Sequence, residues 1–335
     1  MTVLIVTTEE SGVDKYSQEV AARLGIKQVV TSRYLSLVES YRLARLVASE
    51  PDIVHLPNQN FARFAFFRKY PYIVTVHDLI RFYFRFDPEK ITERILLRCD
   101  IRGIKRASHI IAISQNTKDD LIKHLKVSED RISVVYNGID HGIFKPCDKK
   151  LLDEPYILYV GSERPRKNLG TLFEAFAQVK NEFPDLKLVK VGTAGRSEKY
   201  RSDTMEQLTT LGVVEDVIFV DYVSEEDLAC YYSAAALLAY PSLYEGFGLP
   251  PLEAMSCGCP VVTSNTSSLP EVVGEAGIMV DPYDTDSLAQ AMKRILSDNK
   301  LRDDMVRRGL EQAGEFSWEK TAEQTLEVYD KVAAG

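Results

Sequence analysis

The sequence predicts two α/β domains, each with a parallel β-sheet covered by helices on both faces. Short apolar runs alternate with amphipathic stretches along the whole chain, which is the pattern of a doubly wound parallel sheet. At 335 residues, the chain is longer than one compact core usually becomes. A polar, proline-flanked stretch at residues 145–155 interrupts the alternation and suits an exposed linker between two domains.

The first half of the chain contains five predicted strands, with helical patterns between them. The strands are short and mainly apolar, at residues 2–7, 52–56, 72–76, 109–113 and 131–136. The helices have the amphipathic pattern, at residues 13–24, 35–49, 88–107 and 117–125. Asn137-Gly138 then favours a turn that takes the chain out of this sheet.

The second half repeats the alternation and predicts a second Rossmann-like sheet. Its strands are expected at residues 156–160, 187–191, 217–220, 236–240, 260–263 and 277–280. Its helices are expected at residues 169–181, 197–211, 225–233, 250–256 and 285–297. Two last helices, 300–314 and 318–333, follow without a further strand.

Composition describes a globular protein whose two halves differ in charge. Hydrophobic residues make up 45% and charged residues 27% of the chain, with too much apolar content for disorder. The net charge is −8, but residues 1–150 carry 24 Lys and Arg against 18 Asp and Glu, a balance of +6, and the remainder carries −14. Opposite signs suggest that the halves meet different partners.

The cysteines favour free thiols and a reducing, cytoplasmic setting. They are odd in number and scattered, mostly in apolar or helical runs: Cys99, Cys147, Cys230, Cys257 and Cys259. No second cysteine or histidine pair completes a metal site with Cys257 and Cys259, so we expect no metal. The opening residues read as a strand rather than a signal peptide, and no stretch approaches the ~20 apolar residues of a membrane span.

The most informative segment for function is the loop at residues 241–255. It follows a strand, contains Gly246 and Gly248, and leads into a helix with two prolines in its first turn. The backbone N–H groups of Gly248 and Leu249 would lie at the positive end of that helix, where a phosphate or sugar oxygen can bind. The alternative is a tight turn with solvated glutamates, but open α/β sheets bind ligands at this end of their strands.

Glu245 and Glu253 are separated by seven residues within this segment, and the sequence from Glu245 onward is Glu-Gly-Phe-Gly-Leu-Pro. This spacing resembles the signature of the family-4 retaining glycosyltransferases (glycosyltransferase group 1) of GT-B fold, and the resemblance covers nearly the whole chain. It implies two Rossmann-like doubly wound domains that face each other across a cleft. It also implies that Glu245 orients the transferred sugar and that Glu253 binds the ribose. The donor contacts implied around them are Gly246, Phe247, Gly248 and Leu249.

A second candidate site follows the strand at 156–160. A glycine ends this strand, and the basic pair Arg166-Lys167 precedes a helix, where it could neutralise a diphosphate leaving group. Basic charge there opposes the helix dipole, which favours an anionic ligand over a merely solvated helix start. Lys167 matches the family's phosphate-binding lysine. Ser162 stands where many relatives have arginine, and Arg166 is expected to substitute.

Two further candidates lie in the first half. Gly12 follows the first strand, where the family usually has two glycines close to the donor diphosphate; here Ser11 replaces one of them. His77 follows the strand at 72–76, and the resemblance places this histidine opposite the transferred sugar, although a lone histidine is more often structural. In the second half, Tyr222 lies in the segment expected to frame the base.

The resemblance implies a hexosyltransferase that retains the anomeric configuration, with no cofactor and no divalent metal. The sequence of residues 161–168 resembles that of mannosyltransferases that use GDP-mannose more than that of enzymes that use UDP-glucose. A glycan or lipid-linked acceptor is expected. Two alternatives remain open: a non-hydrolysing nucleotide-sugar epimerase of the same fold, and a catalytically silent partner subunit.

Charge and aromatic content in the first half suggest a further surface. Arg94, Arg98, Arg102, Lys105 and Arg106 recur every three or four positions, which makes one helix face basic. This face is either simply solvated or contacts an anionic membrane or acceptor; nucleic acid is not expected.

We expect residues 1–148 to form an acceptor domain and 149–317 a donor domain. In the family, the terminal helix commonly crosses back to the first domain. Residues 318–335 are therefore expected to return there, after a Phe-Ser-Trp segment and an apolar stripe that needs burial.

Overall fold

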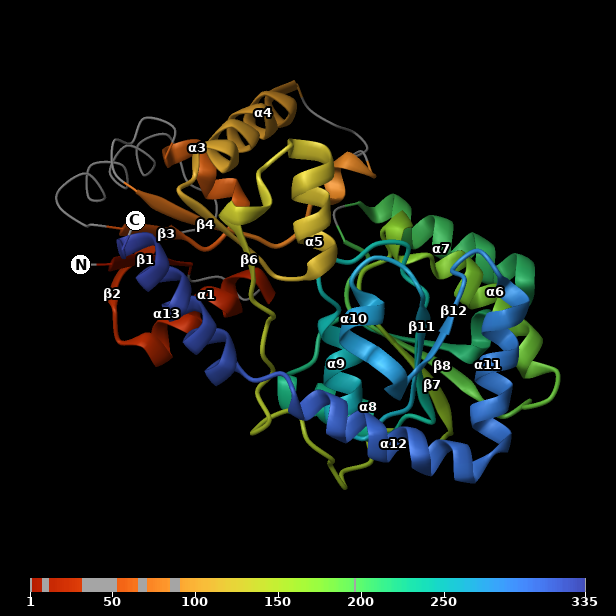
Figure 1. Ribbon diagram of the computed structural model, residues 1–335. Coiled ribbons are helices and arrows are strands. Elements are labelled where there is room, and N and C mark those ends of the chain that lie inside the picture. Colours follow the sequence, from red (N-terminus) through yellow and green to blue (C-terminus); the bar gives the residue numbers. More distant parts are fainter. Residues whose placement is uncertain are drawn as a thin grey trace. The chain divides into compact units, whose positions relative to one another are not determined.

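The computed structural model describes residues 2–7, 12–31, 53–65, 71–84, 91–195 and 197–334. Its contacts divide the chain into two compact units (Figure 1). Unit 1 comprises Met1–Gly138 and Phe316–Gly335, and unit 2 comprises Ile139–Glu315. Each unit is built around a parallel sheet, so the predicted fold class is confirmed.

The sheet of unit 1 has the order β2-β1-β3-β4-β5-β6 among the described residues, and every neighbouring pair is parallel. Its strands are β1 (Thr2–Thr7), β2 (Lys27–Thr31), β3 (Ile53–Leu56), β4 (Tyr72–Val76), β5 (His109–Ala112) and β6 (Ile132–Val134). The strand β2 was not predicted. It is a five-residue edge strand with polar residues at 27, 28 and 31, so it lacks the apolar run that marks the central strands.

Helices lie on both faces of this sheet (Figure 1). They are α1 (Gly12–Leu24), α3 (Ala62–Ala65), α4 (Ile91–Arg106), α5 (Gln115–Asp120) and α13 (Trp318–Ala334). A π-helical turn at Leu121–Leu125 extends α5. The helix expected at 35–49 lies outside the described residues.

In β3 and β4, even-numbered and odd-numbered residues face opposite sides of the sheet, because successive side chains of a strand point in opposite directions. Val54 and Val74 join the buried cluster that includes α3 and α4 residues. Ile53 and Ile73, one residue away in each strand, join the cluster that includes Val328 of α13. The terminal helix therefore covers the face opposite α4.

A tight backbone contact accompanies the return of the chain to unit 1. A Cβ atom on Gly138 would lie 2.1 Å from the backbone nitrogen of Trp318, so only glycine fits there. The Thr321 hydroxyl donates to the carbonyl of Tyr136 at 2.8 Å. The contacts divide the chain after residues 138 and 315, whereas the sequence suggested 148 and 317. The difference at the first boundary arises because residues after 138 pack on unit 2, as Phe144 does by accepting from Ser256 Oγ at 2.6 Å.

The sheet of unit 2 has the order β12-β11-β10-β7-β8-β9, again parallel throughout. Its strands are β7 (Tyr156–Val160), β8 (Lys187–Val191), β9 (Val217–Val220), β10 (Leu237–Tyr240), β11 (Val261–Ser264) and β12 (Ile278–Val280). All six agree with the predicted strands to within one residue. These strands are short apolar runs, and the buried central ones carry the strongest signal.

The helices of unit 2 are α6 (Leu169–Lys180), α7 (Glu198–Leu211), α8 (Glu225–Ala234), α9 (Leu249–Ser256), α10 (Leu269–Val273), α11 (Thr285–Ser297) and α12 (Asn299–Gly314). Side chains of Ser197, Ser224, Asp284 and Asp298 cap the N-termini of α7, α8, α11 and α12. The five-residue α10 was not predicted, because it is too short for a periodic pattern.

The expectation of free cysteines is wrong for two of the five. Cys147 and Cys230 form a disulfide that links the segment before β7 to α8. The two residues are 83 positions apart in sequence, and their Cα atoms lie 5.1 Å apart, within the range that a disulfide spans. Only the fold brings them together. Cys99, Cys257 and Cys259 are free thiols.

No helix within the described ranges is long and apolar enough to cross a membrane.

Candidate active site

The strand order of unit 2 creates a switch point between β7 and β10. From β7 the chain proceeds to β8 and β9 on one side and then returns to β10, which pairs with the other side of β7. Ligands of open α/β sheets bind beyond the carboxyl ends of the strands at such a point. The loops after β7 and β10 are therefore the candidate site.

The loop after β10 ends at the N-terminus of α9. Gly248 precedes this helix with φ of 122°, a left-handed conformation that favours glycine. Pro250 and Pro251 occupy the first turn, and no described side chain caps it. The N–H groups of Gly248 and Leu249 are those that such a turn offers to an anionic ligand.

Hydrogen bonds join this loop to the loop after β7. The N–H of Leu243 donates to the carbonyl of Arg166 at 2.8 Å. The Asn168 amide donates to the carbonyl of Pro241 at 3.1 Å. Asn168 ends the short 3₁₀ helix Pro165–Lys167 in the left-handed conformation, with φ of 58°. The two loops therefore form one layer at the switch point.

Glu245 is buried at the centre of this layer. Its Oε1 accepts from Lys167 Nζ at 2.7 Å, from Ser242 Oγ at 2.6 Å and from the Tyr240 hydroxyl at 3.0 Å. Its Oε2 lies 2.9 Å from Arg166 Nη1. The sequence-predicted residues Arg166, Lys167 and Glu245 are thus in direct contact.

These contacts keep Glu245 ionised. Burial alone would raise the pKa of its carboxyl group, because the charged form loses hydration. The charges of Lys167 and Arg166 and the hydrogen bonds from Lys167 and Ser242 outweigh burial and lower the pKa to about 2. Glu245 therefore carries its negative charge throughout the physiological pH range.

The pKa of Lys167 is shifted as well. Burial and, to a smaller extent, the charge of Arg166 lower it to about 8, although Glu245 acts in the opposite direction. The ammonium lies 4.8 Å from the centroid of the Tyr240 ring and donates to the Tyr240 hydroxyl. Lys167 is therefore mostly charged at neutral pH, but little free energy separates its two protonation states.

The charges of this cluster are suited to binding a diphosphate. Two cationic side chains share a single carboxylate, which leaves a net positive charge beside the N-terminus of α9. Cations and helix N-termini together stabilise phosphate oxygens, most strongly where charge develops on a departing group.

Glu253 lies in the second turn of α9, half-buried. Its Oε2 accepts from the Tyr232 hydroxyl of α8 at 2.8 Å. Tyr232 is fully buried, so this bond fixes the direction of the carboxylate. The seven residues between Glu245 and Glu253 thus place one carboxylate in the loop and the other on the helix that follows it.

The remaining predicted residues of unit 2 lie in the loops that follow β7, β9 and β10. Gly246 and Phe247 lie between Glu245 and α9. Ser162 is half-buried in the loop after β7, and its carbonyl accepts from the Tyr159 hydroxyl at 3.0 Å. Tyr222 follows β9 and is 79% exposed.

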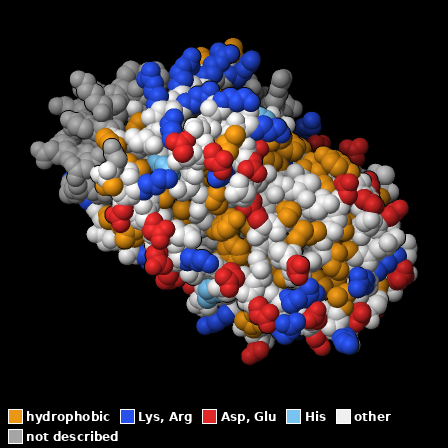
Figure 2. Space-filling model, in the orientation of Figure 1, with side chains coloured by type: hydrophobic (Ala, Val, Ile, Leu, Met, Phe, Trp, Pro, Cys, Tyr) orange, Lys and Arg blue, Asp and Glu red, His pale blue; other side chains and the backbone are white. Residues whose placement is uncertain are grey.

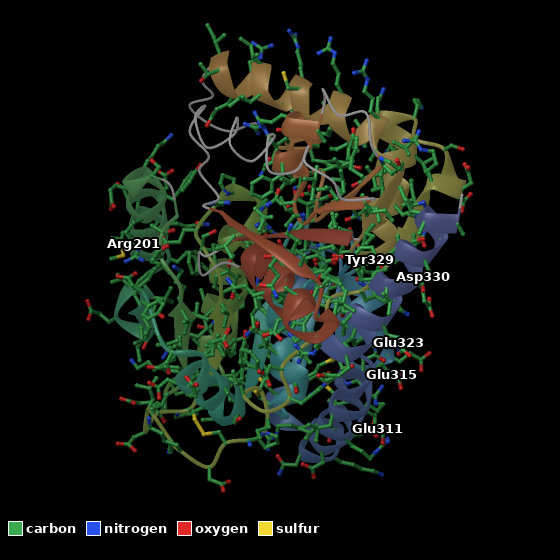
Figure 3. The ribbon with its side chains drawn as sticks, turned by 90° about the vertical axis from the view of Figure 1, so that its left-hand side faces the viewer. Arg201, Glu311, Glu315, Glu323, Tyr329 and Asp330 are labelled. Carbon is green, nitrogen blue, oxygen red and sulfur yellow. A yellow bond between two sulfur atoms is a disulfide. The ribbon has the colours of Figure 1, made fainter. Side chains whose placement is uncertain are left out.

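A buried ionic network that was not predicted joins the ends of β7, β8 and β9. Lys190 Nζ lies 2.9 Å from Glu163 Oε1, and both side chains are fully buried. Arg201 of α7, labelled in Figure 3, bonds the same oxygen and also Asp221 at 3.0 Å. A lysine in a strand usually indicates an exposed position, so the burial of Lys190 could not be predicted from the residue type.

A second group missed by sequence reasoning holds the backbone of Glu245. Its N–H donates to Ser267 Oγ at 2.8 Å, and its carbonyl accepts from Ser268 Oγ at 3.0 Å. Ser267 has φ of 54°, which is uncommon for a residue with a side chain and is often found at functional sites. The run of polar residues after β11 was the feature of the sequence that could have indicated these contacts.

His77 and Gly12 belong to unit 1. His77 follows β4 and is buried, with its Nε2 2.7 Å from the carbonyl oxygen of Pro57. A carbonyl can only accept, so Nε2 carries the hydrogen. Gly12 is the first residue of α1, and the loop before it lies outside the described residues. Within the described ranges, no group of three or more His, Cys, Asp or Glu is placed to hold a metal ion.

Two family models together match nearly the whole chain. The model described as glycosyl transferases group 1 matches residues 145–312. The model described as Glycosyltransferase Family 4 matches residues 1–142. These matches fall on the halves that contain the two parallel sheets.

Curated relatives support the same assignment. The chain is 35% identical over 271 residues to O-antigen chain mannosyltransferase B of Escherichia coli, an alignment that covers 77% of this chain and 69% of the relative. It is 33% identical over 224 residues to O-antigen chain mannosyltransferase RfbU of Salmonella typhimurium, covering 66% and 60%. The serotype-specific mannosyltransferase WbdA of Escherichia coli is longer: a 30% identical match covers 68% of this chain and 29% of WbdA.

Solved structures share the fold over almost the full length. Sucrose-phosphate synthase from Thermosynechococcus elongatus has a TM-score of 0.82 at 22% identity, covering 99% of each chain. Anabaena HepE in complex with UDP-glucose has a TM-score of 0.83 at 21% identity, covering 98% of this chain and 99% of HepE. The fold and the matches define a retaining glycosyltransferase of GT-B fold. The chain belongs to family 4, the group 1 glycosyltransferases.

Proposed function

We propose that this enzyme transfers mannose from GDP-mannose to a glycan or lipid-linked acceptor, without a divalent metal. The observation that carries the donor site is the contact of Lys167 and Arg166 with Glu245 beside the N-terminus of α9. The relatives named as O-antigen mannosyltransferases support mannose and a glycan acceptor. A nucleoside diphosphate is the leaving group that this charge arrangement would stabilise.

Residue roles follow from this proposal. Lys167, Arg166 and the amides of Gly248 and Leu249 bind the diphosphate, with Gly246 and Phe247 completing their loop. Glu253, whose direction Tyr232 fixes, accepts from the ribose hydroxyls. Ser162 and Tyr222 contact the nucleoside part. Glu245 accepts from sugar hydroxyls. Roles for His77 toward the sugar and for Gly12 toward the diphosphate rest on the family pattern alone.

Thermal unfolding with GDP, UDP and ADP tests the donor. A nucleotide at 100 times its dissociation constant adds about 2.7 kcal/mol to the free energy of unfolding, so GDP should raise the melting temperature most. The same ranking, and the release of GDP from GDP-mannose, should persist in EDTA. A larger shift with UDP would overturn the guanine donor, and activity restored only by magnesium or manganese would overturn metal independence.

We also propose that α4 of unit 1 contacts an anionic membrane. Its exposed side includes the apolar Ile91 and Ile95, which are 76% and 53% exposed. The same helix carries five basic residues: Arg94, Arg98, Arg102, Lys105 and Arg106. Lys and Arg side chains gather over α4 in Figure 2. Apolar and basic side chains on one exposed helix fit a bilayer with acidic headgroups.

Vesicle flotation tests this surface. Vesicles with phosphatidylglycerol should retain the protein at low salt, and phosphatidylcholine vesicles should not. Each basic residue near such a surface contributes about 1 kcal/mol, so the double variant Arg98→Glu with Arg102→Glu should weaken binding more than ~10-fold. Reversing the exposed Lys300 and Arg307 of α12 is the matched control for net charge. Equal loss in both double variants would show that α4 is not the contact.

A cytoplasmic location also stays a proposal. The three free cysteines support it. The disulfide between Cys147 and Cys230 weighs against it, because disulfides are rare in a reducing cytosol.

A further inference from the structure

A buried chain of polar side chains lies within unit 1, between the sheet and the helices α1 and α13. Thr75 and His77 are two residues apart at the end of β4, so their side chains lie on the same face of the sheet. That face is the one covered by α13. His55 of β3, Tyr16 of α1 and Tyr329 of α13 complete the chain, and all five side chains are buried.

The hydrogen bonds of this chain have one consistent direction. Thr75 Oγ1 donates to the Tyr16 hydroxyl at 3.1 Å, so it has no proton left for His55 and must accept from His55 Nε2 at 2.7 Å. His55 is then protonated on Nε2, and its Nδ1 accepts from the Tyr329 hydroxyl at 2.6 Å. Burial, together with the nearby His77, lowers the pKa of His55 to about 3, so the ring stays neutral as this pattern requires.

This series of hydrogen-bonded side chains both begins and ends on α13. Tyr329 is its first donor, and Figure 3 labels it on that helix. At the other end, the side chain of Thr325 hydrogen-bonds Tyr16, and the Thr325 hydroxyl donates to the carbonyl of Thr321 at 2.7 Å. Fully satisfied buried networks of this kind specify one arrangement of the groups they join.

His77 packs against the end of this chain. The rings of Tyr16 and His77 meet edge to face, with centroids 5.3 Å apart and planes at 86°. Pro57, two residues after His55, fixes the other side of the imidazole by accepting from Nε2 at 2.7 Å. The Gln59 side chain accepts from the His77 N–H at 3.0 Å. Position, tautomer and ring plane of His77 are therefore set by neighbours from α1 and from the segment after β3.

We propose that Tyr16, His55, Thr75 and Tyr329 are positioning residues that hold the His77 imidazole in its productive orientation and couple it to the terminal helix. The inference rests on the proposed role of His77 toward the transferred sugar. None of the four residues belongs to the unit that contains Lys167 and Glu245. Their loss should therefore slow the reaction without weakening the binding of the donor.

The matched pair Thr75→Val and Thr75→Ser tests this inference. Valine has the shape of threonine and suits a strand, but it cannot accept from His55 or donate to Tyr16; serine keeps the hydroxyl. We expect Thr75→Val to lower kcat for GDP release from the preferred donor about 10-fold with KM unchanged, because small misplacements of a reacting group are costly. Thr75→Ser should restore most of kcat, and Tyr329→Phe should reproduce the loss.

Two reference variants, Val328→Ala and His77→Ala, distinguish this inference from a general loss of stability and from the proposed function. Val328→Ala removes buried packing on α13 next to Tyr329 but none of the hydrogen bonds in the chain. If it slows the reaction as much as Thr75→Val at equal stability, the network is only structural and the inference is wrong. If His77→Ala slows the reaction while Thr75→Val does not, the inference fails and the role of His77 stands. If His77→Ala has no effect, the role of His77 fails and the inference with it.

Discussion

Replacing Glu245 with glutamine is expected to lower turnover at least ~100-fold while the protein stays folded. Glutamine keeps an oxygen that can accept from Lys167, Ser242 and Tyr240, so the hydrogen bonds of Oε1 have a substitute. What is lost is the negative charge that faces Lys167 and Arg166 at 2.7 and 2.9 Å. The substitution therefore tests charge rather than shape.

The loss extends to Lys167. Burial lowers the pKa of Lys167 to about 8, while Glu245 acts in the opposite direction. Without Glu245, the pKa of Lys167 falls further, and a larger share of the lysine is neutral at pH 7.5. One substitution thus removes the carboxylate and also weakens the cation proposed to stabilise the leaving diphosphate.

A double-mutant cycle checks this coupling. Glu245→Gln and Lys167→Met should each reduce kcat/KM at least ~100-fold, and the double variant should be little worse than either, because the two residues act as a unit. Glu182→Gln disrupts an exposed ion pair with Lys293 in the same unit and should leave turnover unchanged. Additive losses in the double variant would show that the two residues act independently.

The fold could be predicted largely from local pattern. In unit 2, every predicted strand is present within one residue, because parallel strands buried on both faces are continuous apolar runs. The edge strand β2 was missed, since three of its five residues are polar. The short α10 was missed because it is shorter than the window that reveals a helical period.

Contacts between distant segments could not be predicted. The disulfide between Cys147 and Cys230 depends on how the segment before β7 passes α8. The burial of Lys190 against Glu163 depends on the loops after β7 and β8. Spacing along the sequence contains neither fact, because both pairs meet through the tertiary fold.

The candidate site could be predicted in part. Glu245, Lys167 and Arg166 were recognised as types of residue at the ends of predicted strands, and the order of the sheet brings them together. Their protonation could not be predicted. The shifts in pKa of Glu245 and Lys167 arise from burial and from distances below 3 Å, which a strand pattern does not contain.

The depressed pKa of Lys167 predicts an alkaline limit of activity. The ammonium form is the one proposed to bind the diphosphate, and it predominates at pH values below the Lys167 pKa of about 8. As pH rises through this value the lysine loses its proton, so kcat/KM should be constant below pH ~8 and fall about tenfold per pH unit above it, since kcat/KM reports the pKa values of the free enzyme. Glu245, with a pKa of about 2, stays ionised across the range and adds no inflection. The measurement is kcat/KM for GDP release from the preferred donor between pH 6 and pH 10.

The variant Lys167→Arg separates this titration from that of the substrate. Arginine stays charged at every pH of the experiment, so its profile should lose the inflection near pH 8 even if its absolute rate is lower. An inflection that belongs to the nucleotide base would remain in the variant. If the Lys167→Arg profile still bends at the same pH as the wild type, Lys167 is not the titrating group. Lys167→Met, which has no charge at any pH, should lie at least ~100-fold below the wild type at pH 7 and approach it only as the wild type itself loses its proton.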